Sequence, residues 1–99
     1  MKSISSEEAL KLVKSGKVLV LDVRTSQENA QARIKGSLLI PVQELESRIE
    51  EVPKGKPILV YCRAGNRSLV ASRILEKHGF KDVLNLKEGI LNCPEECLE

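Results

Sequence analysis

Four short apolar runs along the chain alternate with segments that carry helical patterns. The runs occupy residues 18–21, 38–40, 58–61 and 83–84. Those at 18–21 and 58–61 are apolar at consecutive positions, so both faces of these strands are expected to be buried, as in a parallel sheet covered by helices. This alternation of strands and helices predicts an α/β fold with a mainly parallel central sheet.

Two of the predicted helices begin with the spacing of a capping box. Ser5 is followed three residues later by Glu8, and Thr25 is followed three residues later by Glu28. In this motif the first side chain accepts a hydrogen bond from the start of the helix, and the acidic side chain reaches back to the cap. We therefore expect one helix that begins at Ser5 and ends at Gly16, and a second, short helix that begins at Thr25.

Three further helices are expected because apolar residues recur at helical spacing. They cover residues 42–49, residues 66–78 and a terminal segment from residue 88 onward. Gly79 follows the second of them, and glycine commonly ends a helix. The buried stripe predicted for this helix consists of Val70, Ala71, Ile74 and Leu75.

Composition and charge narrow the function classes. The chain has 99 residues, 41% of them hydrophobic, and a net charge of +2, so we expect one globular domain over residues 1–99. Leu-Glu at 98–99 is typical of a cloning remnant and receives no weight. Acidic and basic residues are interleaved, which argues against a nucleic-acid-binding surface. No apolar run approaches the ~18 residues of a membrane span, and the start of the chain lacks a signal-peptide pattern, so a cytoplasmic protein without membrane contact is expected.

The loop after the third predicted strand carries the candidate chemistry. In a parallel sheet, ligands bind beyond the carboxyl ends of the strands, which is where Cys62 lies. The start of the following helix and the flexible residues Gly65 and Asn66 allow backbone N–H groups to converge on an anion. Arg63 and Arg67 add positive charge. Such surroundings favour a thiolate, so Cys62 is a candidate nucleophile.

Two plainer interpretations bear on this site. A cysteine after a buried strand is by itself more often an inert core residue, and only its neighbours, Ser68 among them, reverse that preference. The single histidine, His78, lies about three turns along the following helix, so it is too far away to be the base of Cys62. We interpret His78 as a charge at the end of that helix.

The other two cysteines, Cys93 and Cys97, bring the total to an odd number, which argues against a disulfide framework. We favour the interpretation that both are small buried or half-buried residues. The alternative is a resolving pair for Cys62, with both thiols on one helical face. No further Cys or His lies close enough in sequence to complete a zinc site, and we expect neither a metal nor a cofactor.

Four segments give the chain a family resemblance: LDVRT at 21–25, RIKGSLLIP at 33–41, VYCRAGNRSLVASRILEKHGF at 60–80 and LKEGI at 86–90. In these segments the chain resembles a single-domain rhodanese-like sulfurtransferase. The resemblance implies a three-layer fold, with a mainly parallel central sheet of about five strands and helices on both faces. It covers most of the chain from Leu21 onward.

The resemblance also implies an activity. The protein would be an enzyme that moves a sulfane sulfur from thiosulfate or a similar donor to a thiophilic acceptor, such as cyanide or a thiol. Cys62 would be the catalytic nucleophile and would carry the sulfur as a persulfide. The expected partners are a small anionic sulfur donor and a thiol-containing acceptor protein.

Further residues take roles from the same resemblance. The active-site loop would bind the substrate through Arg63, Ala64, Gly65, Asn66, Arg67 and Ser68. Its backbone N–H groups would stabilise the terminal sulfur, while Ser68 and Asn66 would fix the loop and cap the helix. Asp22 and Arg24 match the strand-end pair of the family and are interpreted as supports of the loop and sheet edge, with donor binding by Arg24 as the alternative.

Three other functions compete with this interpretation. Cysteine-dependent phosphatases keep one more residue between Cys and Arg than the four that separate Cys62 from Arg67, and the tighter loop suits a single sulfur. A non-catalytic rhodanese-like binding module is disfavoured because the loop cysteine is retained. A thiol redox protein is disfavoured because the chain has no C-x-x-C motif.

The sequence departs from the family pattern around the site. Residues 33–36 read Arg-Ile-Lys-Gly where His-Ile-Pro-Gly is common. Asn29 lies where an aromatic residue is usual, Ala32 where glycine is usual and Cys93 where tryptophan is usual. These differences concern the scaffold, so they bear on acceptor preference more than on sulfur transfer itself.

Overall fold

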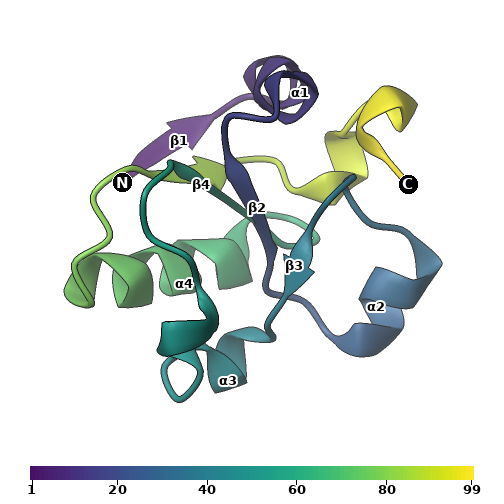
Figure 1. The fold of residues 1–99 in the computed structure, drawn as a ribbon. Coiled ribbons are helices and arrows are strands. Elements are labelled where there is room, and N and C mark those ends of the chain that lie inside the picture. Colours follow the sequence, from purple (N-terminus) through teal and green to yellow (C-terminus); the bar gives the residue numbers. More distant parts are fainter.

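A five-stranded parallel sheet forms the centre of the protein, in a computed structural model that describes residues 1–99 (Figure 1). The strands lie in the order β1-β5-β4-β2-β3, and every neighbouring pair is parallel. The mainly parallel sheet predicted from the apolar runs is therefore confirmed. The strands are β1 (Lys2–Ile4), β2 (Leu19–Asp22), β3 (Leu38–Leu39), β4 (Ile58–Tyr61) and β5 (Val83–Leu86).

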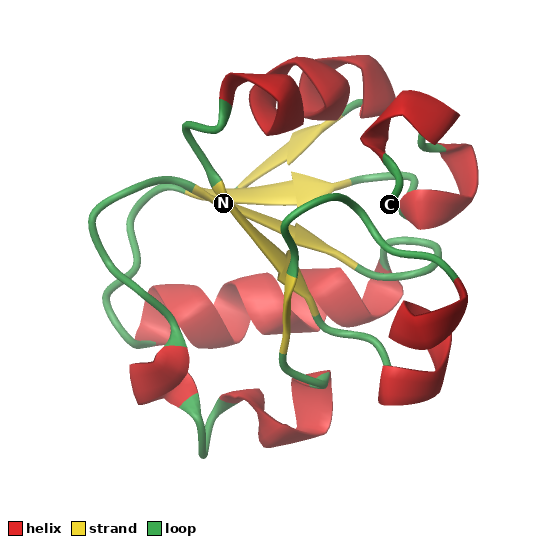
Figure 2. Cartoon of the chain, turned by 45° about the vertical axis from the view of Figure 1, so that its right-hand side comes forward, coloured by secondary structure: helices red, strands yellow, loops and turns green.

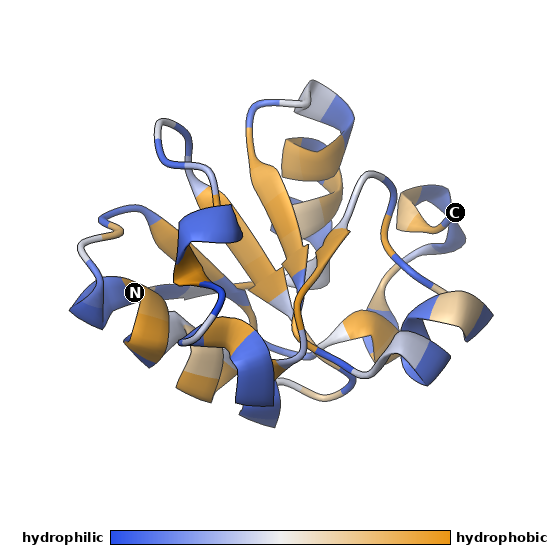
Figure 3. Cartoon of the chain, turned by 60° about the horizontal axis from the view of Figure 1, so that its bottom comes forward, coloured by the Kyte–Doolittle hydropathy of each residue, from blue (hydrophilic) through white to orange (hydrophobic).

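Helices cover both faces of the sheet, which confirms the expected three-layer α/β fold (Figure 2). Because side chains alternate along a strand, Ile58 and Val60 of β4 face one apolar core, whereas Leu59 and Tyr61 face another. The first core lies under α3 (Val42–Leu45) and α4 (Asn66–Lys77), and the second lies under α1 (Ser6–Ser15). The central strands are mostly hydrophobic, as their position between two layers requires, with Asp22 in β2 and Asn85 in β5 as buried polar exceptions (Figure 3).

Both helices predicted from capping boxes begin at the expected positions, but only the second box forms both of its hydrogen bonds. Ser5 Oγ accepts a hydrogen bond from the Glu8 N–H at 3.2 Å, and α1 ends at Gly16 in the left-handed conformation. Thr25 and Glu28 form the full reciprocal box at the start of α2 (Ser26–Gln31). These helix ends are therefore local features of the sequence.

Two helical segments differ from the prediction for residues 42–49 and 88 onward. The first breaks at Arg48, which leaves the helical conformation (φ −115°, ψ 21°), so α3 is followed by a separate 3₁₀ turn, η1 (Ile49–Glu51). The terminal helix is replaced by two 3₁₀ turns, η2 (Ile90–Asn92) and η3 (Glu95–Cys97). Pro94 separates them because its ring disfavours a helical conformation of the preceding residue.

One strand was missed from the sequence, and one residue expected to be buried is exposed. Strand β1 was not predicted, because only Ile4 of its three residues is buried and the strand lies at the sheet edge beside β5. Val70 was placed in the buried stripe of α4, but it is 50% exposed. The buried stripe instead runs through Ser68, Ala71, Ser72 and Leu75.

The sheet brings the candidate site together at one edge. Asp22, the last residue of β2, pairs in register with Tyr61, the last residue of β4. Residues that follow these two strands therefore lie side by side at the carboxyl edge of the sheet, the edge at which parallel α/β proteins bind ligands. Cys62 and Arg24 both leave the sheet at this edge.

Candidate functional site

Cys62 lies at the focus of a tight loop between β4 and α4. Its side chain is almost fully buried, with 1% of the residue surface exposed. The Gly65 N–H donates a hydrogen bond to Cys62 Sγ at 3.0 Å, and Ser68 Oγ lies 3.5 Å from the same sulfur. The Ser68 hydroxyl donates to the Gly65 carbonyl at 3.1 Å, so the loop and the first turn of α4 are joined around the thiol.

These contacts favour the thiolate. Burial alone raises the pKa of the Cys62 thiol, because a charged sulfur loses solvation. The Ser68 side chain and the backbone N–H groups of Ser68, Gly65 and Ala64 act in the opposite direction and outweigh burial. The net effect is a Cys62 pKa below its ordinary value, as the sequence predicted for an anion nest at a helix start.

Two glycines allow the loop its close packing. Gly65 has φ +100°, and a side chain at this position would place Cβ 2.4 Å from the Lys87 carbonyl oxygen. Gly89 has φ +71°, and its Cβ would lie 2.1 Å from the Arg63 carbonyl oxygen. The segment around Gly89 also binds the loop directly, because the Ile90 N–H donates to the Cys62 carbonyl at 3.0 Å. No role for Gly89 was predicted from the sequence, although a glycine shortly after the last strand was the available signal.

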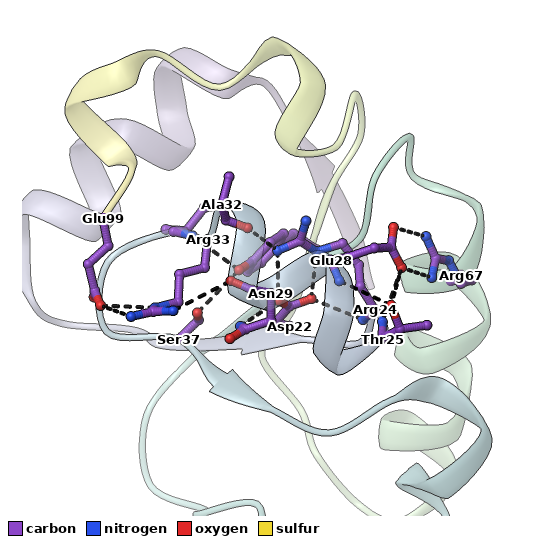
Figure 4. Close-up of polar contacts among 12 residues, drawn as sticks. Asp22, Arg24, Thr25, Glu28, Asn29, Ala32, Arg33, Ser37, Arg67 and Glu99 are labelled. Atoms are coloured by element: carbon purple, nitrogen blue, oxygen red, sulfur yellow. Dashed lines mark hydrogen bonds and ion pairs between the residues drawn. The ribbon is translucent and has the colours of Figure 1, made fainter.

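Asp22 and Arg24 form a buried ion pair beside the loop (Figure 4). Arg24 Nε and Nη2 donate to the two Asp22 carboxylate oxygens, each at 2.9 Å, and Nη2 also donates to the Ala32 carbonyl at 2.7 Å. The guanidinium stacks over the Tyr61 ring with its carbon 5.2 Å from the ring centre. Burial lowers the pKa of Arg24, but the hydrogen bond and charge of Asp22 raise it above its ordinary value.

The same network explains two departures from the family pattern. Asn29, at the usual aromatic position, donates through Nδ2 to Asp22 Oδ2 at 2.9 Å. Ala32, at the usual glycine position, has an extended conformation (φ −163°, ψ 141°) that any residue adopts. Helix α2 buries none of its residues, so these polar contacts are what hold it against the sheet edge. The supporting role of Asp22 and Arg24 stays a prediction with this geometry behind it.

Arg67 forms an ion pair with a residue that no sequence pattern connects to the site. Its Nη1 and Nη2 donate to the Glu28 carboxylate at 2.7 and 2.9 Å, which is a bidentate ion pair (Figure 4). The Arg67 hydrogen bonds hold the pKa of Glu28 down at about 2, despite partial burial. Glu28 was identified only as a capping residue, because its 39-residue separation from Arg67 gives no local signal.

Arg63 is the free cation of the loop. It is exposed and forms no ion pair, in contrast to Arg67. Arg63 lines a cavity of about 410 Å³ at the carboxyl edge of the sheet. The other walls of this cavity include Arg24, Glu28, Ala32, Ile90 and Leu91.

The remaining loop residues differ in how they meet the predictions. Ala64 and Asn66 are exposed, whereas Ser68 is buried against Cys62. The N-cap of α4 is Gly65, and Asn66 is already the first helical residue, so the expected capping by Asn66 is wrong. Gly65 takes this place because it reaches the left-handed conformation without a side chain that would collide with Lys87.

Cys93 and Cys97 lie away from the loop thiol. Both contribute to the core under α1, whereas Cys62 belongs to the core on the opposite face of the sheet. Burial and the neighbouring Cys97 thiol raise the pKa of Cys93 to about 12, so Cys93 is a thiol near neutral pH. All three cysteines are free, and no group of three or more His, Cys, Asp or Glu residues is arranged to hold a metal ion.

Comparison with known proteins identifies the family. Residues 5–93 match the model of the rhodanese-like domain. The chain belongs to the rhodanese-like domain family. A protein named sulfurtransferase from Allochromatium vinosum is 40% identical over 74 residues, covering 75% of this chain and 69% of its own length. The thiosulfate sulfurtransferase GlpE of Coxiella burnetii is 35% identical over 88 residues, covering 89% of this chain and 82% of its own length.

Solved structures agree with this assignment. A rhodanese-like domain protein from Staphylococcus aureus superimposes with a TM-score of 0.88 at 31% identity, over 100% of this chain and 97% of that one. This rhodanese-like domain is thus similar to named sulfurtransferases in sequence and to rhodanese-like structures in fold. The resemblance inferred from the four sequence segments is confirmed. None of the helices has both the length and the apolar character needed to cross a membrane.

Proposed function

We propose that this rhodanese-like domain is a thiosulfate-type sulfurtransferase in which Cys62 carries the transferred sulfur as a persulfide. The observation that supports this most directly is the environment of Cys62 Sγ. The sulfur is buried, receives the Gly65 N–H at 3.0 Å and has a lowered pKa. A lowered pKa increases the share of the thiolate, which is the nucleophilic form, without an adjacent base.

The proposed reaction has two steps. The Cys62 thiolate attacks the outer sulfur of thiosulfate, the donor S–S bond breaks, and sulfite leaves with the bonding electron pair. The product is the persulfide Cys62–S–S⁻. A nucleophilic acceptor such as cyanide or a thiolate then attacks the terminal sulfur, which releases the thiolate of Cys62 and closes the cycle.

The loop residues take distinct roles in this proposal. The backbone N–H groups of residues 63–68 converge on the terminal sulfur of the persulfide, which carries the negative charge, and stabilise it. Arg63 attracts the anionic donor to the cavity, because it is exposed and unpaired. Arg67 fixes the loop to α2 through its ion pair with Glu28. Asp22 and Arg24 keep the sheet edge and α2 in register with the loop.

Partners and cellular context follow from the same proposal. The chain acts as one domain over residues 1–99, in the cytoplasm, where a protein thiol serves as acceptor. The donor is a small anion, since the cavity of about 410 Å³ falls in the range of small-molecule sites. The four residues between Cys62 and Arg67 argue against the phosphatase alternative, because a shorter loop leaves less room for a phosphoryl group.

Steady-state kinetics test the proposal. We expect thiocyanate formation from thiosulfate and cyanide, with parallel double-reciprocal lines, because the persulfide separates two half-reactions. Cys62→Ser should abolish the activity, whereas Cys93→Ala, a change at a thiol on the other sheet face, should leave it intact. Activity that survives in Cys62→Ser would refute Cys62 as nucleophile. Hydrolysis of p-nitrophenyl phosphate by the wild type, with no thiocyanate formed, would favour a phosphatase.

A further inference from the structure

The charge on Arg67 is compensated before any donor arrives. Its two terminal nitrogens are taken up by the Glu28 carboxylate at 2.7 and 2.9 Å. Glu28 in turn is fixed by its capping box, since Thr25 N and Oγ1 each donate to Glu28 Oε1 at 3.1 Å. The carboxylate is therefore oriented from both sides and stays ionised, so the pair has no net charge.

Glu28 also belongs to the wall of the cavity beside the loop. The cavity holds two arginines, but Arg24 is neutralised by its buried pair with Asp22. Arg63 is thus the single uncompensated cation, and the Glu28 carboxylate lies on the same cavity. Because the Glu28–Arg67 pair is neutral as well, the cavity offers an incoming anion one net positive charge, which matches a monoanion and leaves one charge of a dianion uncompensated.

Apart from Gln31, the rest of the wall is apolar. Ala32, Ile90 and Leu91 line the cavity, and Leu91 is 61% exposed, which is unusual for a large hydrophobic residue in this chain. An inorganic anion makes no use of such a surface, whereas an organic group buries it and gains about 25 cal/mol per Å² of apolar area. The charge and the apolar wall point to the same class of ligand by independent arguments.

We propose that Glu28 and Leu91 are specificity-determining residues that select a monoanionic, organic sulfane-sulfur donor over dianionic thiosulfate. The inference rests on the proposed sulfur transfer through Cys62 and names its substrate class. In the transfer the Cys62 thiolate attacks the terminal sulfur of R–X–S⁻, the X–S bond breaks, and R–X⁻ leaves with the electron pair. Charge and atoms balance without an external oxidant or reductant.

Thiosulfonates provide matched probes. Methanethiosulfonate differs from thiosulfate by a methyl group in place of one charged oxygen, and benzenethiosulfonate adds an aromatic ring. Each would be assayed with cyanide as acceptor in the wild type and in Glu28→Gln, where Gln keeps the capping box but removes the charge. Comparing the two proteins cancels the different intrinsic reactivities of the donors.

Glu28→Gln should raise kcat/KM for thiosulfate about five- to tenfold through KM, because the Arg67 charge is then no longer compensated, and change the methanethiosulfonate value less than about twofold. Leu91→Ala should lower kcat/KM for benzenethiosulfonate about three- to tenfold, the effect of about 30–50 Å² of apolar area that is no longer buried, and change the methanethiosulfonate value little. Glu51→Gln is the control, because it removes a comparable bidentate pair with Arg48. This pair lies in the segment before β4, whereas Cys62 follows β4, so kcat/KM should stay unchanged for every donor.

Several results would overturn the inference. Equal losses for all donors in Glu28→Gln would mean that Glu28 only positions Arg67. A second measurement uses the wild type alone: methanesulfonate should protect Cys62 from iodoacetamide at least as well as sulfate, and stronger protection by sulfate would contradict the charge argument. Inactivity of the wild type with all three donors would instead refute the proposed function itself, a result separable from the others.

Discussion

Removal of the Ser68 hydroxyl tests how the loop stabilises the thiolate. Ser68 Oγ lies 3.5 Å from Cys62 Sγ and donates its only proton to the Gly65 carbonyl at 3.1 Å. When Cys62 ionises, the hydroxyl can turn from the carbonyl to the sulfur. A hydrogen bond to a charged acceptor contributes about 1.5–3 kcal/mol, and the neutral bond that is given up contributes about 1 kcal/mol. The net stabilisation of the thiolate is about 1 kcal/mol, or roughly a fivefold change in the ionisation equilibrium.

The assay is the rate of Cys62 alkylation by iodoacetamide as a function of pH. The lowered pKa of Cys62 means that the rate rises with pH at a lower midpoint in the folded protein than in the unfolded chain. Ser68→Ala should move this midpoint upward and slow alkylation below it about fivefold, with equal rates at high pH. Ser72→Ala is the matched control, because Ser72 is a buried serine of the same helix that donates to the Ser68 carbonyl at 2.8 Å. A Ser68→Ala profile that superimposes on the wild type, or is slowed equally at every pH, would refute the reasoning.

Three other expected outcomes concern the scaffold and the remaining thiols. Gly89→Ala should lower the free energy of unfolding by more than the about 1–3 kcal/mol of a strained backbone, since its Cβ would lie 2.1 Å from the active-site loop. Gly16→Ala is the control, because Gly16 has φ +68° but open space around it, so only the backbone strain is added. Equal urea midpoints for the two variants would contradict the clash. Asp22→Ala should lower the free energy of unfolding, measured in urea, by about 3–5 kcal/mol because it leaves the buried Arg24 guanidinium unpaired. A loss below about 1 kcal/mol, the value typical of surface ion pairs, would contradict this. We expect two thiols to resist alkylation at neutral pH until the protein unfolds: Cys93, whose pKa is raised to about 12, and the fully buried Cys97. Mass analysis of the folded protein that finds both labelled together with Cys62 would contradict this.

Local sequence signals predicted much of the fold. The N-cap at Ser5, the capping box at Thr25 and the apolar run at 58–61 act within a few residues, and each appears in the structure where it was expected. Strand β1 has no such signal, because two of its three residues are exposed and it exists only through pairing with β5. Val70 has an apolar side chain, but the orientation of α4 is set by how Ser68, Ala71 and Leu75 fit the sheet, which the helical period alone does not fix.

The site divides in the same way. The loop from Cys62 to Ser68 is contiguous, so its composition alone predicts an anion nest. The partners of the loop are distant in sequence: Glu28 on α2 and Gly89 after β5 meet it only because three strand ends lie at one edge of the sheet. Glu28 compensates the charge of Arg67 only because the fold brings α2 next to the loop, and no local pattern in the sequence predicts this contact.

Intact-protein mass after incubation with thiosulfate tests the central claim most directly, with the wild type beside Cys62→Ser. The account predicts that the wild type gains the mass of one sulfur atom, that cyanide removes it, and that the variant gains nothing. A methanethiosulfonate-treated sample should give the same product, since the persulfide does not depend on the donor that formed it. No added sulfur from either donor, in a protein whose Cys62 still reacts with iodoacetamide, would contradict the persulfide mechanism.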